Sequence, residues 1–206
     1  MSEAVAYTAA EAAFVLREPI RLVKKALDDG PVQAKLIAKP GGTVRAIEWS
    51  DLLYLYAVRV LRDELTPKGR NEFYHALKGV HVDRAREVRF GRFSVVIDDL
   101  KAEVEERSRE LVELAEKVEF RPDGEPVLKR NPVEVYRIAA LLAGGLSVDE
   151  VREDYPSLRT DEIETARAYA EAHPKSGRPY PRTTVKRALK SAGLEALDEV
   201  LGTEEA

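Results

Sequence analysis

Basic side chains gather at two places where their number and spacing suit the recognition of an anionic partner. Arg21, Lys24 and Lys25 are spaced so that they form one stripe on a helix. Between Pro174 and Lys190 the chain carries six Lys or Arg residues and no Asp or Glu. Such residues pair with phosphates or carboxylates, and the planar guanidinium of arginine does so through two parallel hydrogen bonds. Both runs therefore predict binding surfaces.

Residues that could carry out catalysis are scattered. None of the three histidines, His75, His81 and His173, has the i, i+4 spacing to another histidine that a helical metal site requires. The Gly41-Gly42 pair lies in a predicted hairpin tip, and the sequence contains no Gly-x-Ser-x-Gly nucleophile elbow. The absence of cysteine excludes disulfides, thiolate catalysis and cysteine-bound metal. We therefore expect that the protein is not an enzyme and has no cofactor or metal site. The enzymatic alternative is a hydrolase with a metal site that the sequence does not reveal.

Composition indicates an ordinary folded protein whose charge is unevenly distributed. With 206 residues, 44% hydrophobic and 34% charged, the chain is long enough for one or two helix-rich domains. Residues 1–100 carry 16 Lys/Arg and 14 Asp/Glu, whereas residues 101–172 carry 11 and 18. The N-terminus lacks a basic region followed by an apolar one, and no apolar run reaches membrane-spanning length. We expect a cytoplasmic protein, without a membrane partner, whose parts bind different molecules.

The first basic stripe belongs to the second of two predicted short helices. Thr8 and Glu11 have the spacing of a capping box, so the first helix begins after Thr8 and ends near Arg17. The second helix covers 19–29, stops at Gly30, and carries an apolar stripe opposite the basic one.

A hairpin and a further helix follow. Residues 34–49 form two extended runs around "KPGGT", and Ser50 is placed to cap the next helix. Helix, turn, helix, hairpin, helix is the order of a winged helix-turn-helix, which reads operator DNA as a symmetric dimer. The alternative is a solvated basic helix face. The predicted DNA contacts are Arg17, Arg21, Lys24, Lys25, Lys39 and Arg45.

The middle of the chain combines a long helix with three short ones. Thr66-Pro67 starts a helix, 87–98 reads as a strand or hairpin, and 99–118 is a helix with a narrow apolar stripe that suits either dimerisation or packing on its own domain. Asn131, Ser147 and Thr160 are predicted helix caps, and the glycines after Ala143 end the first short helix. The last two short helices expose mostly acidic residues, which would repel a phosphate backbone and favour a protein partner.

The prolines at 174, 179 and 181 keep the start of the tail extended, and Thr183 or Thr184 caps a short helix. Leu194, Leu197 and Leu201 would continue its apolar contact. A loose basic tail that adds non-specific DNA affinity is the alternative. The predicted protein-partner contacts are Arg178, Tyr180, Arg182, Lys186, Arg187 and Leu189.

These patterns predict a mainly α fold with small β hairpins. The predicted parts are a winged helix-turn-helix and dimerisation domain over 1–118, a three-helix domain over 119–173, and an extended partner-binding tail over 174–206.

Residues 125–171 resemble the small trihelical antitoxin domain, long catalogued as a domain of unknown function. The resemblance rests on "LLAGG", on Ser147 and Glu150, on "DYP" with Leu158, and on Tyr169-Ala170, and it covers about fifty residues. The "GTRI" that usually precedes the first helix is replaced here by "KRNPVEV".

With a winged helix in front of it, such a domain is similar to VapB-type antitoxins. The resemblance implies a PIN-like ribonuclease toxin encoded by an adjacent gene, whose acidic residues hold Mg²⁺, and repression of the shared operon. It also implies a homodimer, or a heterotetramer with the toxin. The alternative is a free-standing winged-helix transcriptional regulator whose C-terminal domain binds a protein or a ligand.

Overall fold

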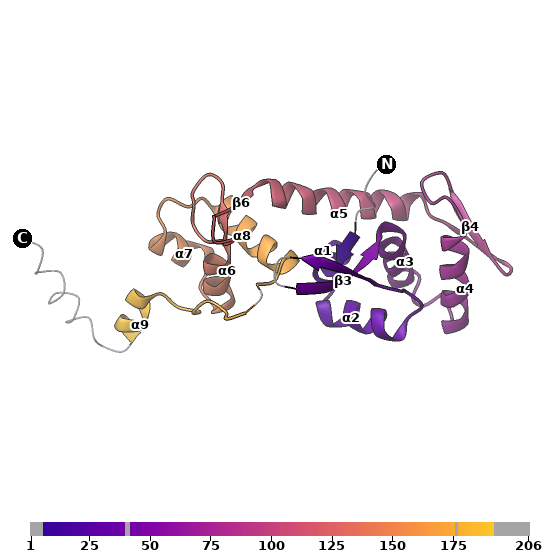
Figure 1. Cartoon of the computed structure of the whole chain (residues 1–206), viewed down its shortest axis with the longest axis horizontal. Helices are drawn as coiled ribbons and strands as arrows, with labels where there is room; N and C mark the ends of the chain where they lie inside the picture. Colours follow the sequence, from indigo (N-terminus) through magenta and orange to yellow (C-terminus); the bar gives the residue numbers. More distant parts are fainter. Residues whose placement is uncertain (1–5, 40–41, 176, 192–206) are drawn as a thin grey trace, which may run out of the picture. The chain divides into compact units, whose positions relative to one another are not determined.

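The computed structural model describes residues 6–39, 42–175 and 177–191, apart from the side chains of residues 186, 190 and 191. The predicted partner contact Lys186, the hairpin-tip Gly41 and the three leucines after 193 therefore lie outside the described side chains or residues. The chain divides into two compact units (Figure 1). Unit 1 comprises the residues up to Glu113 together with Glu171–Pro174, and unit 2 comprises Leu114–Ala170 together with the residues from Lys175.

Helices dominate both units and the sheets are small and antiparallel, which confirms the coarse fold class. Within residues 6–39, 42–175 and 177–191, no helix is both long and apolar enough to cross a bilayer. The helices are α1 (Ala9–Leu16), α2 (Ile20–Asp29), α3 (Trp49–Val60), α4 (Pro67–Lys78), α5 (Asp98–Glu116), α6 (Val135–Ala143), α7 (Val148–Asp154), α8 (Thr160–Ala172) and α9 (Val185–Ser191). The strands are β1 (Ala6–Thr8), β2 (Lys35–Lys39), β3 (Gly42–Glu48), β4 (Glu87–Phe90), β5 (Phe93–Val96), β6 (Val118–Phe120) and β7 (Pro126–Leu128).

The first two helices form as predicted. The Thr8 hydroxyl accepts from the Glu11 amide at 3.3 Å, and the Glu11 carboxylate accepts from the Thr8 amide at 2.7 Å. Helix α1 ends at Arg17, whose backbone is left-handed with φ 52°. Helix α2 ends at Gly30 and buries Val23 and Leu27. Local capping therefore fixes the start of α1, and burial of one side of α2 fixes which side of that helix faces solvent.

The predicted hairpin is present as β2 and β3, and β1 adds to it in the order β1-β3-β2. The β1 pairing was not predicted. The cap expected at Ser50 is wrong: α3 begins at Trp49, with Glu48 as its N-cap and Asp51 completing a reciprocal box. The Glu48 amide donates to the Asp51 carboxylate at 3.1 Å, so the helix starts two residues earlier than predicted.

Helix α4 starts at the predicted Thr66-Pro67 cap, and β4 and β5 form a hairpin that turns at Gly91 with φ 56°. The narrow apolar stripe of α5 packs inside its own unit, because Val104 and Leu111 belong to the core that includes Phe73. This stripe is therefore already covered within one chain.

Unit 2 contains the three predicted short helices around a core of Val135, Ile138, Leu141, Leu158 and Ile163. The capping box at Ser147 is confirmed.

Two predicted starts in unit 2 are wrong. Helix α6 begins at Val135 with Glu134 as its N-cap, and not at Asn131, whose side-chain amide donates to the Glu162 carboxylate at 2.8 and 2.9 Å. Thr160 is already the first residue of α8, and Glu162 accepts from the Arg159 amide in the place of a cap. The β6–β7 hairpin was not predicted.

Candidate binding surfaces

The solvent-facing side of α2 carries three exposed cations, Arg21, Lys24 and Lys25. No ion pair involves any of them within the described part of the chain. Asp28, on the same side of the helix, pairs with Arg45 at 2.5 Å. The acidic residue is thus neutralised while the three cations stay available for an anionic partner.

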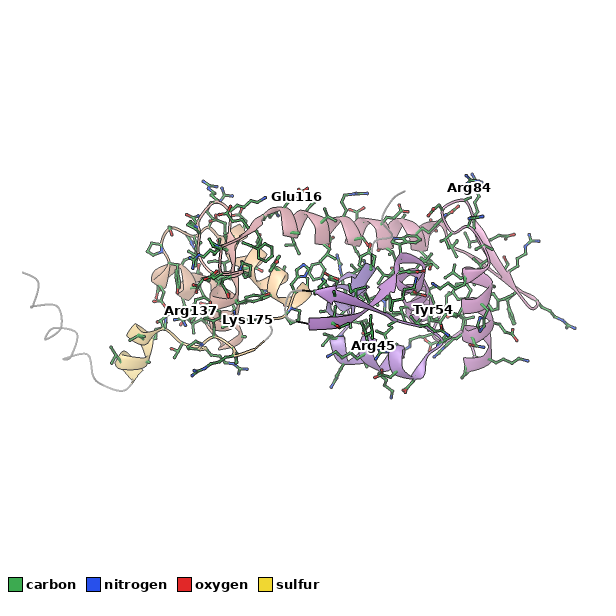
Figure 2. All side chains as sticks on the ribbon, viewed as in Figure 1. Arg45, Tyr54, Arg84, Glu116, Arg137 and Lys175 are labelled. Carbon is green, nitrogen blue, oxygen red and sulfur yellow. The ribbon has the colours of Figure 1, made fainter. Side chains whose placement is uncertain are left out.

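The other three predicted DNA contacts are engaged within unit 1. Arg45 donates to Asp28 and also to the Leu27 carbonyl at 3.1 Å, so it satisfies the last turn of α2 (Figure 2). Lys39, at the end of β2, donates to Glu11 at 3.0 Å. Arg17 pairs with Glu110 at 3.4 Å, and both of these side chains are exposed. These three cations are committed to intramolecular contacts, which distinguishes them from the α2 stripe.

Among the described carboxylates of unit 1, Glu11 has the most strongly shifted pKa. It is 7% exposed and accepts from Thr8, Lys39 and His173 Nδ1, the last at 3.3 Å. Burial by itself would raise the pKa of Glu11, but the three hydrogen bonds outweigh it and lower the pKa to about 2. The side chain therefore ties α1, β2 and the segment Glu171–Pro174 together as an anion.

A cleft of about 570 Å³ lies between α2, α3 and α4. Its walls are mainly apolar, with Leu22 and Ala26 from α2 facing Leu55 and Val58 from α3. Lys25 also lines it. This volume lies within the range of about 300–1,000 Å³ that is usual for ligand pockets.

In unit 2 the tail does not extend freely but packs along the three-helix domain. The Lys175 ammonium lies 5.1 and 5.0 Å from the ring centres of Tyr136 and Tyr180, and it pairs with Glu125 at 2.6 Å (Figure 2). Burial and hydrogen bonds to Glu134 and Glu125 raise the pKa of the Tyr180 hydroxyl. The predicted aromatic anchor is therefore bound to its own domain.

The short helix at the end of the described tail packs on α7. Thr184, one of the two predicted caps, accepts from the Arg187 amide at 3.3 Å and donates to Asp154 at 3.2 Å. The Arg187 guanidinium pairs with Asp154 at 2.9 Å and with Glu150 and Glu153 at 3.2 Å each. Its hydrogen bond to Asp154, strengthened by the other carboxylates, raises the pKa of Arg187. Arg187 is therefore enclosed by the acidic surface that the sequence predicts for protein binding.

Between these two contacts the tail crosses α6 at Gly144. A methyl group on the Gly144 Cα would lie 2.2 Å from the Arg182 carbonyl oxygen and 2.8 Å from its Cβ, which no side chain tolerates. Arg178 and Arg182 are both exposed, and no ion pair to either occurs in residues 177–191 or their described surroundings. Leu189 is half-buried. Among the predicted partner contacts whose side chains are described, Tyr180 and Arg187 are docked, and Arg178 and Arg182 are available.

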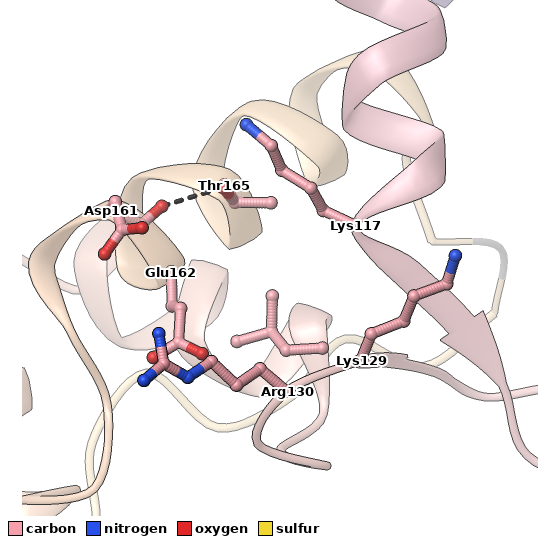
Figure 3. A pocket seen from close by; sticks show the side chains of 7 residues that line it. Lys117, Lys129, Arg130, Asp161, Glu162 and Thr165 are labelled. Carbon is pink, nitrogen blue, oxygen red and sulfur yellow. Dashed lines mark hydrogen bonds between the residues drawn. The ribbon is translucent and has the colours of Figure 1, made fainter.

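A smaller cavity, of about 210 Å³, lies between the first turn of α8 and the residues just after β7 (Figure 3). Lys129 and Arg130 line it together with Glu162, whose carboxylate is already engaged by Asn131. Figure 3 shows Lys129 pointing away from Glu162. The volume of this cavity is below the usual range of ligand pockets, and the residues that line it carry charges of both signs, so we assign no ligand to the cavity.

Sequence patterns did not indicate the contacts that hold the tail. Glu125 and Tyr136 have no local motif, and they meet Lys175 only because the chain folds back over about 40–50 residues. Gly144 did carry a signal, as the first glycine of a pair. Its backbone is helical with φ −80°, so only the close approach of Arg182 requires glycine there, whereas Gly145 has φ 98° and forms the turn.

The three-helix part of unit 2 matches a known family. Residues 122–170 match the family described as "Protein of unknown function (DUF433)". This is about a quarter of the chain. An uncharacterized protein of Sinorhizobium fredii (strain NBRC 101917 / NGR234), y4eO, is 42% identical over 76 residues, which are 35% of this chain and 34% of that protein. The chain thus spans about a third of the length of this curated relative.

Among solved structures, the crystal structure of Rv2018 from Mycobacterium tuberculosis is similar over 78% of this chain and 96% of that one, at 16% identity. The TM-score is 0.28, too low for this likeness to carry an argument about fold or function.

Proposed function

We propose that this chain is an antitoxin that represses its own operon and neutralises a PIN-like ribonuclease toxin. The observation that carries the proposal is that each of the two units has its own available basic surface. One lies on α2 in unit 1 and the other, Arg178 with Arg182, lies on the tail in unit 2. A protein that binds two different anionic partners at the same time needs two such surfaces, because one surface cannot serve both.

Operator binding is assigned to α1, α2 and the β2–β3 hairpin, acting as a winged helix-turn-helix in a homodimer. Arg21, Lys24 and Lys25 project from the helix that such a motif places in the major groove. The paired cations Lys39 and Arg45 hold the hairpin and α2 in place and contribute less to phosphate binding.

Toxin binding is assigned to the tail. The active site of a Mg²⁺-dependent ribonuclease is a cluster of carboxylates, and a guanidinium can bind such a cluster through two hydrogen bonds. Exposed arginines on a segment without its own core suit this task, and the acidic surface of unit 2 favours contact with protein over DNA.

The test is co-expression of the chain with the reading frame next to its gene, with an affinity tag on one of the two. We expect both proteins to purify together and growth to be protected. A chain that ends after Pro174 keeps Glu171–Pro174 in unit 1 and loses the tail. It should bind operator DNA with unchanged affinity and should leave the toxin active. Full protection by this shortened chain would contradict the toxin-binding assignment.

The second candidate function is a winged-helix regulator that responds to a small ligand, and the cleft beside α2 is the observation that favours it. A ligand there would contact Lys25 and so alter operator binding directly. Replacement of Val58 by tryptophan would fill the cleft. An operator affinity that responds to cell extract in the native protein, and not in Val58→Trp, would favour this function over the first.

A further inference from the structure

We propose that α6 and α7 form a docking site for the tail, and that docking presents Arg178 and Arg182 as the two side chains offered to the partner. We call residues 177–185 the strap. The docking half of this proposal stands on the structure of unit 2 alone, whereas the presentation half rests on the proposed function.

The strap is held at both ends. Before it, Lys175 is held by Glu125 and by the ring of Tyr136. At its other end, Thr184 of the strap and Arg187 just after it bind Asp154, whose side chain is only 9% exposed. A segment fixed at two ends loses much of its conformational entropy before any partner arrives, which lowers the cost of binding.

The middle of the strap packs tightly against Gly144 at the end of α6. The Arg182 backbone lies so close to Gly144 that no larger residue fits beneath it. Gly144 has ordinary helical dihedral angles, so alanine there would satisfy the helix and collide only with the strap. We infer that Gly144, the first glycine of "LLAGG", is the residue on which the strap packs.

This arrangement assigns different roles to the tail arginines. Arg187 is a positioning residue, because its guanidinium is already shared among three carboxylates of α7. Arg178 and Arg182 are exposed on the docked strap and keep their hydrogen-bond donors for another molecule. The partner chemistry that fits them is a cluster of carboxylates.

Tryptic cleavage after Arg182 tests docking in the purified full-length protein. Cleavage of a docked segment follows the population of the released form, so Gly144→Ala and Asp154→Asn should each speed it by about tenfold. Gly79→Ala is the matched control: Gly79 ends α4 with φ −84°, and a methyl there would approach nothing closer than 3.5 Å. Cleavage of Gly144→Ala at the native rate, in a protein that remains folded by circular dichroism, would overturn the docking site.

Capture of the neighbouring-frame protein tests presentation. The double variant Arg178→Ala/Arg182→Ala should lose capture, whereas Arg187→Ala should weaken it and also speed cleavage after Arg182. Native capture by the double variant would overturn the presentation half. If the unaltered chain captures nothing, the proposed function fails, and the cleavage experiment still decides whether the strap docks.

Discussion

At the scale of single residues, Glu11 makes the stability of unit 1 depend on pH. Its pKa is about 2 in the folded chain and 4.5 ordinarily, so its contribution is complete above pH 4.5 and is lost as the pH falls towards 2. The shift corresponds to about 3 kcal/mol. We expect Glu11→Gln to lower the free energy of unfolding at pH 7. The same substitution should make the free energy of unfolding depend less on pH between pH 4.5 and 2. Urea unfolding followed by fluorescence of Trp49, the single tryptophan, measures both.

A second residue-scale prediction separates paired from available cations. Lys39→Ala should lower the urea midpoint, because it removes a partner of the buried Glu11 anion, and should leave the salt dependence of operator binding nearly unchanged. Lys24→Ala should do the opposite, since Lys24 is exposed on α2. A flatter salt dependence in Lys39→Ala at native stability would show that Lys39 contacts phosphate after all.

The sequence could not distinguish these two kinds of cation. Lys39 and Glu11 are 28 positions apart, and Arg45 and Asp28 are 17 apart, so the pairs exist only after the β2–β3 hairpin packs beside α1 and α2. The composition of the basic face was predictable, but its electrostatic partners depend on tertiary structure.

At the scale of elements, α2 sets the expected response of operator binding to salt. Each phosphate contact releases about one counterion, so the log–log slope should flatten by about one unit for each cation removed. Lys24→Ala/Lys25→Ala should therefore flatten it by about two. An unchanged operator affinity in this double variant would remove α2 from the DNA interface.

Helix α5 gives another element-scale prediction. Val104 is fully buried in its own unit, so Val104→Ala should cost about 2 kcal/mol of stability without changing the oligomeric state. Val112, on the same helix and 58% exposed, is the control and should change little when replaced by alanine. Urea unfolding and light scattering measure the two properties. If Val104→Ala kept native stability but no longer formed a dimer, the result would show that α5 is part of a dimer interface.

The first residue of a helix was predictable where the capping residue bonds within its own helix. It was missed where the capping residue bonds to a partner far away in the sequence. Thr8, Thr66 and Ser147 cap their helices as the sequence indicates. Asn131 has the right type and position, but its amide is engaged by Glu162, 31 positions away. Strand β1 was missed for the same reason, since three residues gain strand character only by pairing with β3.

At the scale of the whole molecule, the two units are not consecutive pieces of sequence. Ala172 is fully buried in the core of unit 1, and His173 contacts Glu11. A fragment that ends at residue 118 lacks both, and we expect its urea midpoint, followed by Trp49 fluorescence, to fall below that of the full chain. A chain ending after Pro174 should keep the native midpoint. Equal midpoints for the two shortened chains would show that unit 1 is complete without Glu171–Pro174.

The return of the chain to unit 1 at Ala172 has a consequence for its synthesis. A ribosome that has made Glu113 must add almost sixty further residues, which takes roughly 3–12 s at 5–20 residues per second, before Ala172 can complete the core of unit 1. By then the whole DUF433 segment, residues 122–170, has been translated. A prematurely released nascent chain would therefore carry the α2 stripe on an incomplete core, exposed to proteolysis. Translation itself thus favours molecules that have both units over molecules that have only the first.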